Sequence, residues 1–275
     1  MSSNSRLDQA DGLRRLISAS STQHIAFLSA VPAPQKNVVL NNLAAALVNV
    51  GSDVHLLDAS QHSQGISSIA NQQIHHYLSD ITEENKDTST IMYEQSRSIY
   101  FSKLSRNPIN SLKEQPLVLQ KLSQTLLEIK PDINFCLIDI FLDNDNPFLL
   151  PELAQADVIV LTNNTPDSIK SAYLQIKDLH AQLGRRPYHV LVVGSTLEQA
   201  KQIQHNMSQA AKLYLAVPLI SLGVIPHDEF LARAAQLGKT VIDAFPTAVS
   251  ASAFRSIATQ LVEKTHHIKT SKTSN

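Results

Sequence analysis

The sequence contains little glycine, one cysteine and no tryptophan. Its 275 residues include only 7 glycines, whereas an average composition of roughly 7% would give about 19. The glycines stand at positions 12, 51, 65, 184, 194, 223 and 238. None of these positions is close enough to another to form a glycine-rich phosphate-binding loop. The single cysteine, Cys136, excludes an intrachain disulfide and a cysteine-based zinc cluster.

The sequence also lacks a long apolar run and an excess of either charge. No stretch approaches the roughly 18 consecutive apolar residues of a transmembrane helix. Residues Met1 to Arg6 have no apolar segment behind them, unlike a secretory leader. The chain has 23 basic and 24 acidic residues and a pI of about 6.8, which argues against bulk binding to nucleic acid. We therefore expect a cytoplasmic protein with no nucleic-acid partner.

Short apolar segments alternate with longer helical patterns along most of the chain. The predicted strands are 24–29, 54–57, 98–101, 135–138, 158–161, 190–193, 213–217 and 224–225. The predicted helices are 37–50, 112–129, 166–183, 197–212 and 250–263, with a short one near 72–78. Continuous apolar strands between helices are typical of a parallel sheet that is covered on both faces. The fold class is therefore α/β, with a mainly parallel sheet and helices on both faces.

The pattern divides the chain into three segments. Residues 1–20 are an amino-terminal arm with a predicted helix from Leu7 to Ile17, and residues 21–264 form the main domain. Residues 265–275 are a polar, basic tail in which Ile268 is the single apolar residue. Binding at a membrane surface needs an apolar face as well as positive charge, so we expect no stable membrane binding.

The first loop of the sheet, Ser29 to Asn37, has the position of a phosphate-binding loop but not its chemistry. Such a loop needs glycines, so that N–H groups can turn toward the phosphates, and a hydroxyl that holds magnesium. This loop has no glycine, and Pro32 and Pro34 each remove an N–H donor. Asn37 stands where the hydroxyl belongs, and only Lys36 keeps its place.

Residues 29–44 align without gaps to the loop S-G-K-G-G-V-G-K-T-N-V-S-V-N-L-A of the MinD/ParA deviant P-loop ATPases. Further matches follow in order at 56–59, 137–139, 165–173, 222–229 and 244–246. The chain thus resembles the MinD/ParA family, and within it the branch of FlhG/FleN flagellar-number regulators. The resemblance implies a P-loop NTPase fold with a nucleotide site at the carboxyl edge of the sheet.

The residues that perform chemistry in this family are replaced here. The signature lysine falls on Val31, the magnesium-binding threonine on Asn37, and the second aspartate after the second strand on Ser60. The family's glycines fall on Ala30, Pro32, Ala33 and Gln35, its small residues after the Walker B aspartate (Asp139 here) on Phe141 and Leu142, and its adenine-reading asparagine on Gly194. The resemblance with these losses predicts a pseudo-ATPase, not an enzyme, because every source of phosphoryl-transfer stabilisation is affected. We expect no catalytic residue, no metal site and no ATP or magnesium cofactor.

Four residual positions of the nucleotide site are Lys36, Asn37, Asp58 and Asp139. Each also has a purely structural interpretation. Lys36 is equally consistent with an ordinary first-turn lysine of a helix, and the two aspartates with caps of the turns that follow their strands.

The arm carries a second motif, Asp8 to Arg14, which reads D-Q-A-D-G-L-R. It resembles the D-Q-A-x-x-L-R activator motif of FlhG-type proteins, which implies docking on the SRP-type GTPase FlhF and stimulation of GTP hydrolysis. The resemblance assigns partner contacts to five residues: Asp8, Gln9, Ala10, Leu13 and Arg14. The Gln9 amide suits the orientation of an attacking water, and Arg14 suits pairing with acidic or phosphate groups. The alternative is an arm helix that packs on its own domain.

The first functional hypothesis is therefore a pseudo-ATPase regulator that uses its arm to stimulate an FlhF-like GTPase in flagellar placement or number control. The second is a weak ATPase with an altered site that uses Lys36 and Asp139. The third is an adaptor or antiactivator that binds a transcription factor or another flagellar or polar protein.

Overall fold

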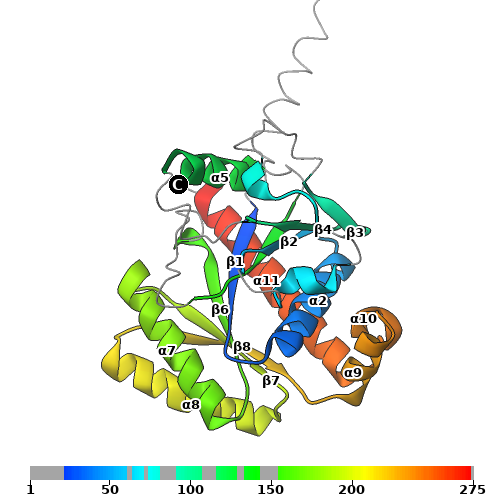
Figure 1. Ribbon diagram of the computed structural model, residues 1–275. Coiled ribbons are helices and arrows are strands. Elements are labelled where there is room, and N and C mark those ends of the chain that lie inside the picture. Colours follow the sequence, from blue (N-terminus) through cyan, green and yellow to red (C-terminus); the bar gives the residue numbers. More distant parts are fainter. Residues whose placement is uncertain are drawn as a thin grey trace, which may run out of the picture.

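The computed structural model describes residues 22–60, 64–70, 74–80, 91–106, 116–128, 133–142 and 154–273. They form one eight-stranded sheet of order β3-β4-β2-β5-β1-β6-β7-β8 (Figure 1). The strands are β1 Gln23–Ser29, β2 Val54–Asp58, β3 Tyr93–Ser96, β4 Ile99–Lys103, β5 Phe135–Asp139, β6 Asp157–Thr162, β7 Tyr188–Val193 and β8 Leu219–Ile225. All neighbouring pairs are parallel except β3 and β4.

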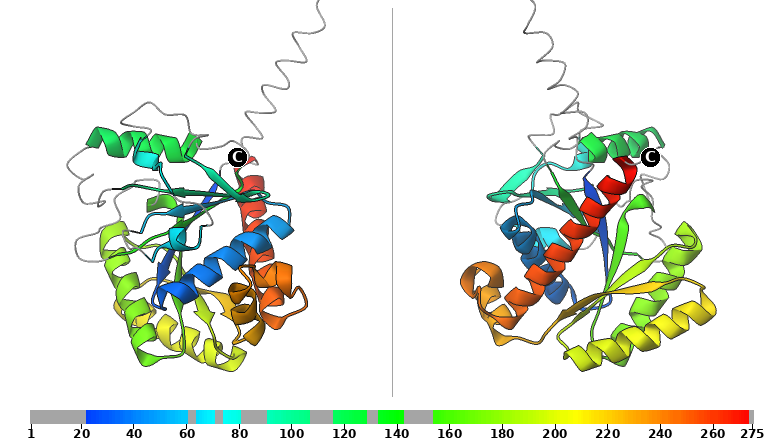
Figure 2. Two further views of the ribbon diagram at one scale, coloured as in Figure 1. Left: turned by 45° about the vertical axis from the view of Figure 1, so that its right-hand side comes forward. Right: turned by 180° about the vertical axis from the view of Figure 1, so that it is seen from behind.

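Helices cover both faces of this sheet (Figure 2). The helices are α2 Ala33–Asn49, the 3-10 helix η1 Ile66–Ile69, α5 Pro116–Glu128, α7 Pro166–Leu183, α8 Leu197–Tyr214, α9 Glu229–Gln236, α10 Val241–Ala244 and α11 Val249–Thr273. The core on one face is shared with α2, α9, α10 and α11, and the core on the other face with α5, α7 and α8. The predicted α/β class with a mainly parallel sheet is confirmed.

Strand β1 shows why the central strands read as continuous apolar runs. Ile25 and Phe27 belong to the core shared with α2 and α11, whereas Ala26 and Leu28 belong to the core shared with α7. Successive side chains of a strand point to opposite faces, so a strand covered on both faces is apolar at most of its positions. The parallel register then brings the carboxyl ends of β1, β2 and β5 together, with Asp58 of β2 opposite Asp139 of β5.

Helix α2 begins at Ala33, four residues before its predicted start. The prediction treated the prolines as loop residues, but Pro32 is the residue before the helix and Pro34 lies in its first turn. Proline is tolerated there because the first N–H groups of a helix have no intrahelical partner. The two prolines therefore form the start of α2.

The predicted strand at 213–217 is wrong. Leu213 and Tyr214 end helix α8, where their side chains are 74% and 73% exposed, and the edge strand β8 covers Leu219–Ile225. A short apolar run at the end of a helix cannot be distinguished from a strand by periodicity alone.

The excursion after β2 also differs from its prediction. Of the short helix expected near 72–78, positions 74–77 are not helical, positions 78–80 are helical, and residues 71–73 lie outside the described part. The 3-10 helix η1 at Ile66–Ile69 precedes that region. This earlier position places η1 beside the carboxyl edge of the sheet.

Helix α11 continues to Thr273, ten residues beyond its predicted end at 263. Residues 265–273 of the polar, basic tail therefore continue helix α11. Neither glycine nor proline occurs between Val249 and Asn275, so the sequence contains no stop signal there. Every helix in the described part of the chain is too short or too polar to span a membrane.

Candidate functional site

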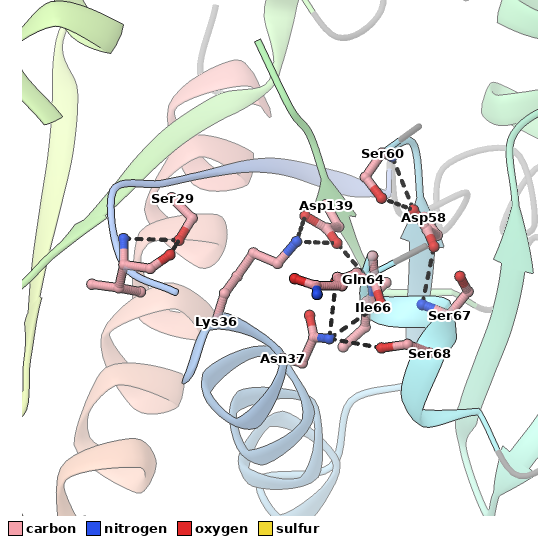
Figure 3. A network of polar contacts seen from close by, with 12 residues as sticks. Ser29, Lys36, Asn37, Asp58, Ser60, Gln64, Ile66, Ser67, Ser68 and Asp139 are labelled. Atoms are coloured by element: carbon pink, nitrogen blue, oxygen red, sulfur yellow. Dashed lines mark hydrogen bonds and ion pairs between the residues drawn. The ribbon is translucent and has the colours of Figure 1, made fainter. Parts of the chain in front are cut away.

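The candidate site lies where the carboxyl ends of β1, β2 and β5 meet the first turn of α2 (Figure 3). Lys36 extends from α2 to Asp139 at the end of β5, and its Nζ is 2.6 Å from both carboxylate oxygens. Both residues are buried, with exposed fractions of 7% and 0%. Burial raises the pKa of Asp139, and the Lys36 ammonium opposes that shift. The lysine charge is thus neutralised inside the protein.

Asn37 joins the start of α2 to the η1 segment. Its Nδ2 donates to the carbonyls of Gln64 and Gly65, at 3.2 and 3.1 Å, and lies 3.0 Å from Ser68 Oγ. The side chain is buried. The amide NH2 of Asn37 therefore donates to carbonyl oxygens of its own chain.

The two aspartates act on the same segment. Asp58 accepts hydrogen bonds from the N–H and Oγ of Ser60, at 2.9 and 2.6 Å, and from the N–H of Ser67 at 3.0 Å. Asp139 accepts a further bond from the N–H of Ile66 at 2.7 Å. The bonds from Ser60 to Asp58 are those of a cap on the turn after its strand, whereas Asp139 accepts from the segment that follows β2.

Gly65 lets the segment pack directly on the aspartate. A Cβ atom at this position would lie 2.0 Å from Ser60 Oγ and 2.4 and 2.5 Å from the Asp58 carboxylate oxygens. Its φ of −61° is open to any residue, so the requirement for glycine is one of space. Gly65, Ile66 and Ser67 were missed from sequence, and an isolated glycine before an Ile-x-x-Ile spacing is the only signal that points to them.

The loop between β1 and α2 uses its remaining polar groups internally. The N–H of Ala30 donates to a β6 carbonyl at 2.9 Å, and the N–H of Val31 donates to Ser29 Oγ at 3.2 Å. Pro32 and Pro34 have no N–H. Four of the loop's backbone positions are therefore without a free donor for an anion.

Two cavities flank the start of α2. One, of about 290 Å³, is lined by apolar residues such as Val31 and Phe141 and by five polar ones: Ser29, Lys36, Ser60, Gln64 and Gln175. The other, of about 310 Å³, lies between α2 and the ends of β7 and β8 and includes Gly194 and His227.

The structure thus brings the four residual positions Lys36, Asn37, Asp58 and Asp139 into one network (Figure 3). The five predicted activator residues of the arm, Asp8, Gln9, Ala10, Leu13 and Arg14, lie outside the described residues. Within the described ranges, no group of three or more His, Cys, Asp or Glu side chains could hold a metal ion.

The chain is distantly similar to two curated proteins. It is 23% identical over 224 residues to the antiactivator FleN of Pseudomonas aeruginosa, covering 81% of this chain and 80% of that protein. It is 24% identical over 240 residues to an ATP-binding protein of Methanocaldococcus jannaschii, covering 86% and 87% of the two chains. No protein-family model matches the chain.

Solved structures resemble the chain in fold. The chain superposes with a TM-score of 0.64 on MinD cell-division protein from the Aquifex aeolicus MinC:MinD complex, at 18% identity over 88% of this chain and 96% of that one. A ParA-family ATPase of Chlorobium tepidum gives 0.62, at 15% identity over 88% and 99%. The fold is that of the MinD and ParA ATPases.

A MinD structure that contains nucleotide shares this MinD/ParA fold. MinD from Pyrococcus horikoshii, solved in complex with Mg-ADP, matches with a TM-score of 0.54 at 22% identity, over 90% of this chain and 98% of that one. Relatives with the fold therefore include ATPases that bind a magnesium nucleotide. In this chain the corresponding edge of the sheet holds the Lys36–Asp139 pair and the η1 segment.

Proposed function

We propose that this chain is a non-catalytic MinD/FlhG-like regulator, a pseudo-ATPase whose arm binds and stimulates an SRP-type GTPase of the FlhF kind in flagellar placement or number control. The observation that supports the proposal most is the buried contact of Lys36 with both oxygens of Asp139. The lysine that would contact phosphate is already neutralised by its own chain.

The other residues of the site fit magnesium triphosphate poorly. Magnesium requires oxygen ligands in nearly octahedral geometry, but Asn37 offers its amide nitrogen to carbonyls and both aspartates accept backbone N–H groups. Phosphoryl transfer is catalysed mainly by a phosphate cradle, a metal ion and added cations. The loop supplies no glycine cradle, and Val31 replaces the signature lysine. The proposal therefore includes no ATP or magnesium cofactor.

The arm motif supports the proposed stimulation of a GTPase, since the motif is intact in a sequence whose phosphate-binding loop is altered. Asp8, Gln9, Ala10, Leu13 and Arg14 would supply the contacts. Leu13 provides an apolar anchor for a groove on the partner. Gln9 provides one donor and one acceptor with which to orient the water that attacks GTP in the partner's site. Gly12 lowers the stability of an isolated helix by about 1 kcal/mol relative to alanine, which suits a helix that forms on binding.

The test is GTP turnover by the cognate FlhF-like GTPase. The full chain and a peptide of residues 1–20 should both raise the turnover. Gln9→Ala in either should lose most of that effect while retaining binding, because Leu13 and Arg14 still make their contacts. Ser18→Ala, at a position outside the motif, is the matched control and should stimulate like the unaltered chain.

A chain and a peptide that both leave GTP turnover unchanged would contradict the proposal. Equal stimulation by the Gln9→Ala variant would be consistent with the proposed GTPase partner but would contradict the role of Gln9 in orienting water.

A second candidate function is that of an antiactivator, because a relative that matches over most of its length is the antiactivator FleN. The domain, and not the arm, would then bind a transcriptional activator. A pull-down with the full chain and with a chain lacking residues 1–20 separates the two. Retention of an activator by the shortened chain favours the antiactivator, and loss of a GTPase from it favours the first function.

A further inference from the structure

The cavity beside Lys36 has no part in the proposed function. Its volume is about 290 Å³, and six apolar residues contribute to its lining: Leu28, Val31, Ala33, Ile140, Phe141 and Leu142. They come from the end of β1, the loop before α2, the first residue of α2 and the segment that follows β5. A concave, mostly apolar pocket with a few polar groups is the usual form of a small-molecule site.

Buried side chains form part of the cavity wall. Leu28, Val31 and Ile140 have exposed fractions of 1%, 7% and 7%, whereas Phe141 is 41% exposed. A ligand inside would contact these buried side chains, with Phe141 at the surface. A hollow of this kind favours a small molecule over the contact of a flat protein surface.

The cavity carries no unbalanced charge from Lys36. That ammonium lies 2.6 Å from both oxygens of Asp139, so the pair is neutral as a unit. Moving an ion into an apolar pocket without a free counter-charge is strongly unfavourable. The lining therefore selects against phosphates and carboxylates.

The lining includes Gln175, whose side chain has an unpaired acceptor. The Nε2 of Gln175 donates to the carbonyl of Ser29 at 3.0 Å, which fixes the orientation of the amide. Its Oε1 is buried and has no hydrogen-bond partner among the described residues. An unpaired buried acceptor costs about 1–3 kcal/mol, and a ligand N–H or O–H would remove that cost.

We propose that this cavity is a binding site for an uncharged small molecule with an apolar ring or chain and one hydrogen-bond donor. The apolar lining holds the body of the ligand, and Gln175 accepts from its donor. At about 290 Å³ the cavity is near the lower end of the roughly 300–1,000 Å³ usual for such sites. The ligand is thus about the size of one or two rings.

The test adds each of four probes to the full chain. Binding is measured from the methyl NMR signals of Leu28, Val31 and Ile140. Indole and phenol are uncharged donors, toluene has no donor, and benzoate is an anion. Indole and phenol should shift these methyl signals saturably. Toluene should bind more weakly, and benzoate weaker than phenol by about tenfold or more, which corresponds to about 1.4 kcal/mol.

Three variants assign the site. Ala33→Leu fills the cavity and should weaken indole binding by about tenfold or more. Ala232→Leu places the same side chain in the second cavity and is the matched control, which should bind indole like the unaltered chain. Gln175→Leu should abolish the preference for phenol over toluene. Its methyl spectrum should remain that of a folded protein.

Three results would overturn the proposal: no saturable shift with any probe, equal indole binding by Ala33→Leu, or a preference for benzoate. If a protein partner alone shifts the Phe141 signals while no probe does, the cavity is a protein-docking pocket and the small-molecule site is rejected. None of these results depends on the arm, so failure here leaves the GTPase measurement to decide the proposed function.

Discussion

Lys36 and Asp139 are the residues on which the account of the site depends. A buried ion pair is not a strong net source of stability, because both charges lose their hydration. Removing one partner is nevertheless costly, since the other charge is then buried without compensation. Lys264 and Asp157 form a comparison pair at 2.8 Å whose side chains are 39% and 22% exposed.

Lys36→Met should lower the free energy of unfolding by about 3–5 kcal/mol, because it leaves the Asp139 carboxylate buried and unpaired. Lys264→Met, which breaks the more exposed pair, should cost no more than about 1 kcal/mol. Urea unfolding at pH 7 measures both. Equal costs, or a Lys36→Met variant as stable as the parent, would show that Lys36 is free to meet a ligand.

His55 is a second residue with a measurable signature. Its Nε2 is 2.7 Å from Ser102 Oγ and its Nδ1 is 3.5 Å from Cys136 Sγ, all three side chains being buried between β2, β4 and β5. Burial, followed by the nearby charge of His24, lowers the pKa of His55 to about 3. Burial also raises the pKa of the Cys136 thiol. The imidazole is therefore neutral in the folded protein.

This pKa predicts how stability depends on pH. The unfolded state binds a proton at His55 below about pH 6.5, whereas the folded state does not until about pH 3. The stabilisation that comes from His55 is therefore fully present above about pH 6.5. As the pH falls below that value, the free energy of unfolding decreases with a slope that approaches 1.4 kcal/mol per pH unit. Urea unfolding between pH 7.5 and 4.5 should show a steeper decline for the parent than for His55→Leu. Parallel curves would contradict the assigned pKa.

The η1 element shows how a short segment controls the site. Three of its backbone and side-chain groups, from Ile66, Ser67 and Ser68, bond to Asp139, Asp58 and Asn37. The close packing depends on Gly65, because a side chain there would overlap the Asp58 carboxylate. The element therefore holds Asn37, Asp58 and Asp139 in one network.

Gly65→Ala should displace η1 and destabilise the protein by about 1–3 kcal/mol, as overpacking usually does. Amide hydrogen exchange of Ile66 and Ser67 should accelerate, since their acceptors are lost. Gly184→Ala is the control: a Cβ there meets no atom within 4 Å, although its φ of +73° carries a backbone cost. Slow exchange at Ile66 in the Gly65→Ala protein would show that the packing is looser than described.

Sequence patterns predicted some elements much better than others. Helix α7 was predicted with its observed bounds because Thr165 caps it, Pro166 opens it and Gly184 ends it. Strand β3 was missed because its sequence Tyr-Glu-Gln-Ser has no apolar run, as an edge strand with half-exposed positions allows. Local sequence signals predict the bounds of an element when they lie in it or next to it. They fail when tertiary contacts stabilise the element.

At the scale of the whole molecule, the parallel sheet made part of the site predictable. Strand ends of a parallel sheet meet at one edge, so Asp58 and Asp139 were expected near Lys36, as observed. The bonds to η1 were not predictable. They join residues up to 73 positions apart, and the donors at Ile66 and Ser67 are backbone groups with no sequence signature. The arm lies outside the described residues, so its role stays a prediction.

The central claim is that the altered site does not take a magnesium nucleotide, and titration calorimetry of the full chain with Mg-ATP tests it most directly. The account predicts no saturable heat at nucleotide concentrations up to the low millimolar range, with the parent and Lys36→Met giving the same trace. Saturable binding of one Mg-ATP per chain with a micromolar Kd, lost in Lys36→Met, would contradict the account and favour a weak ATPase.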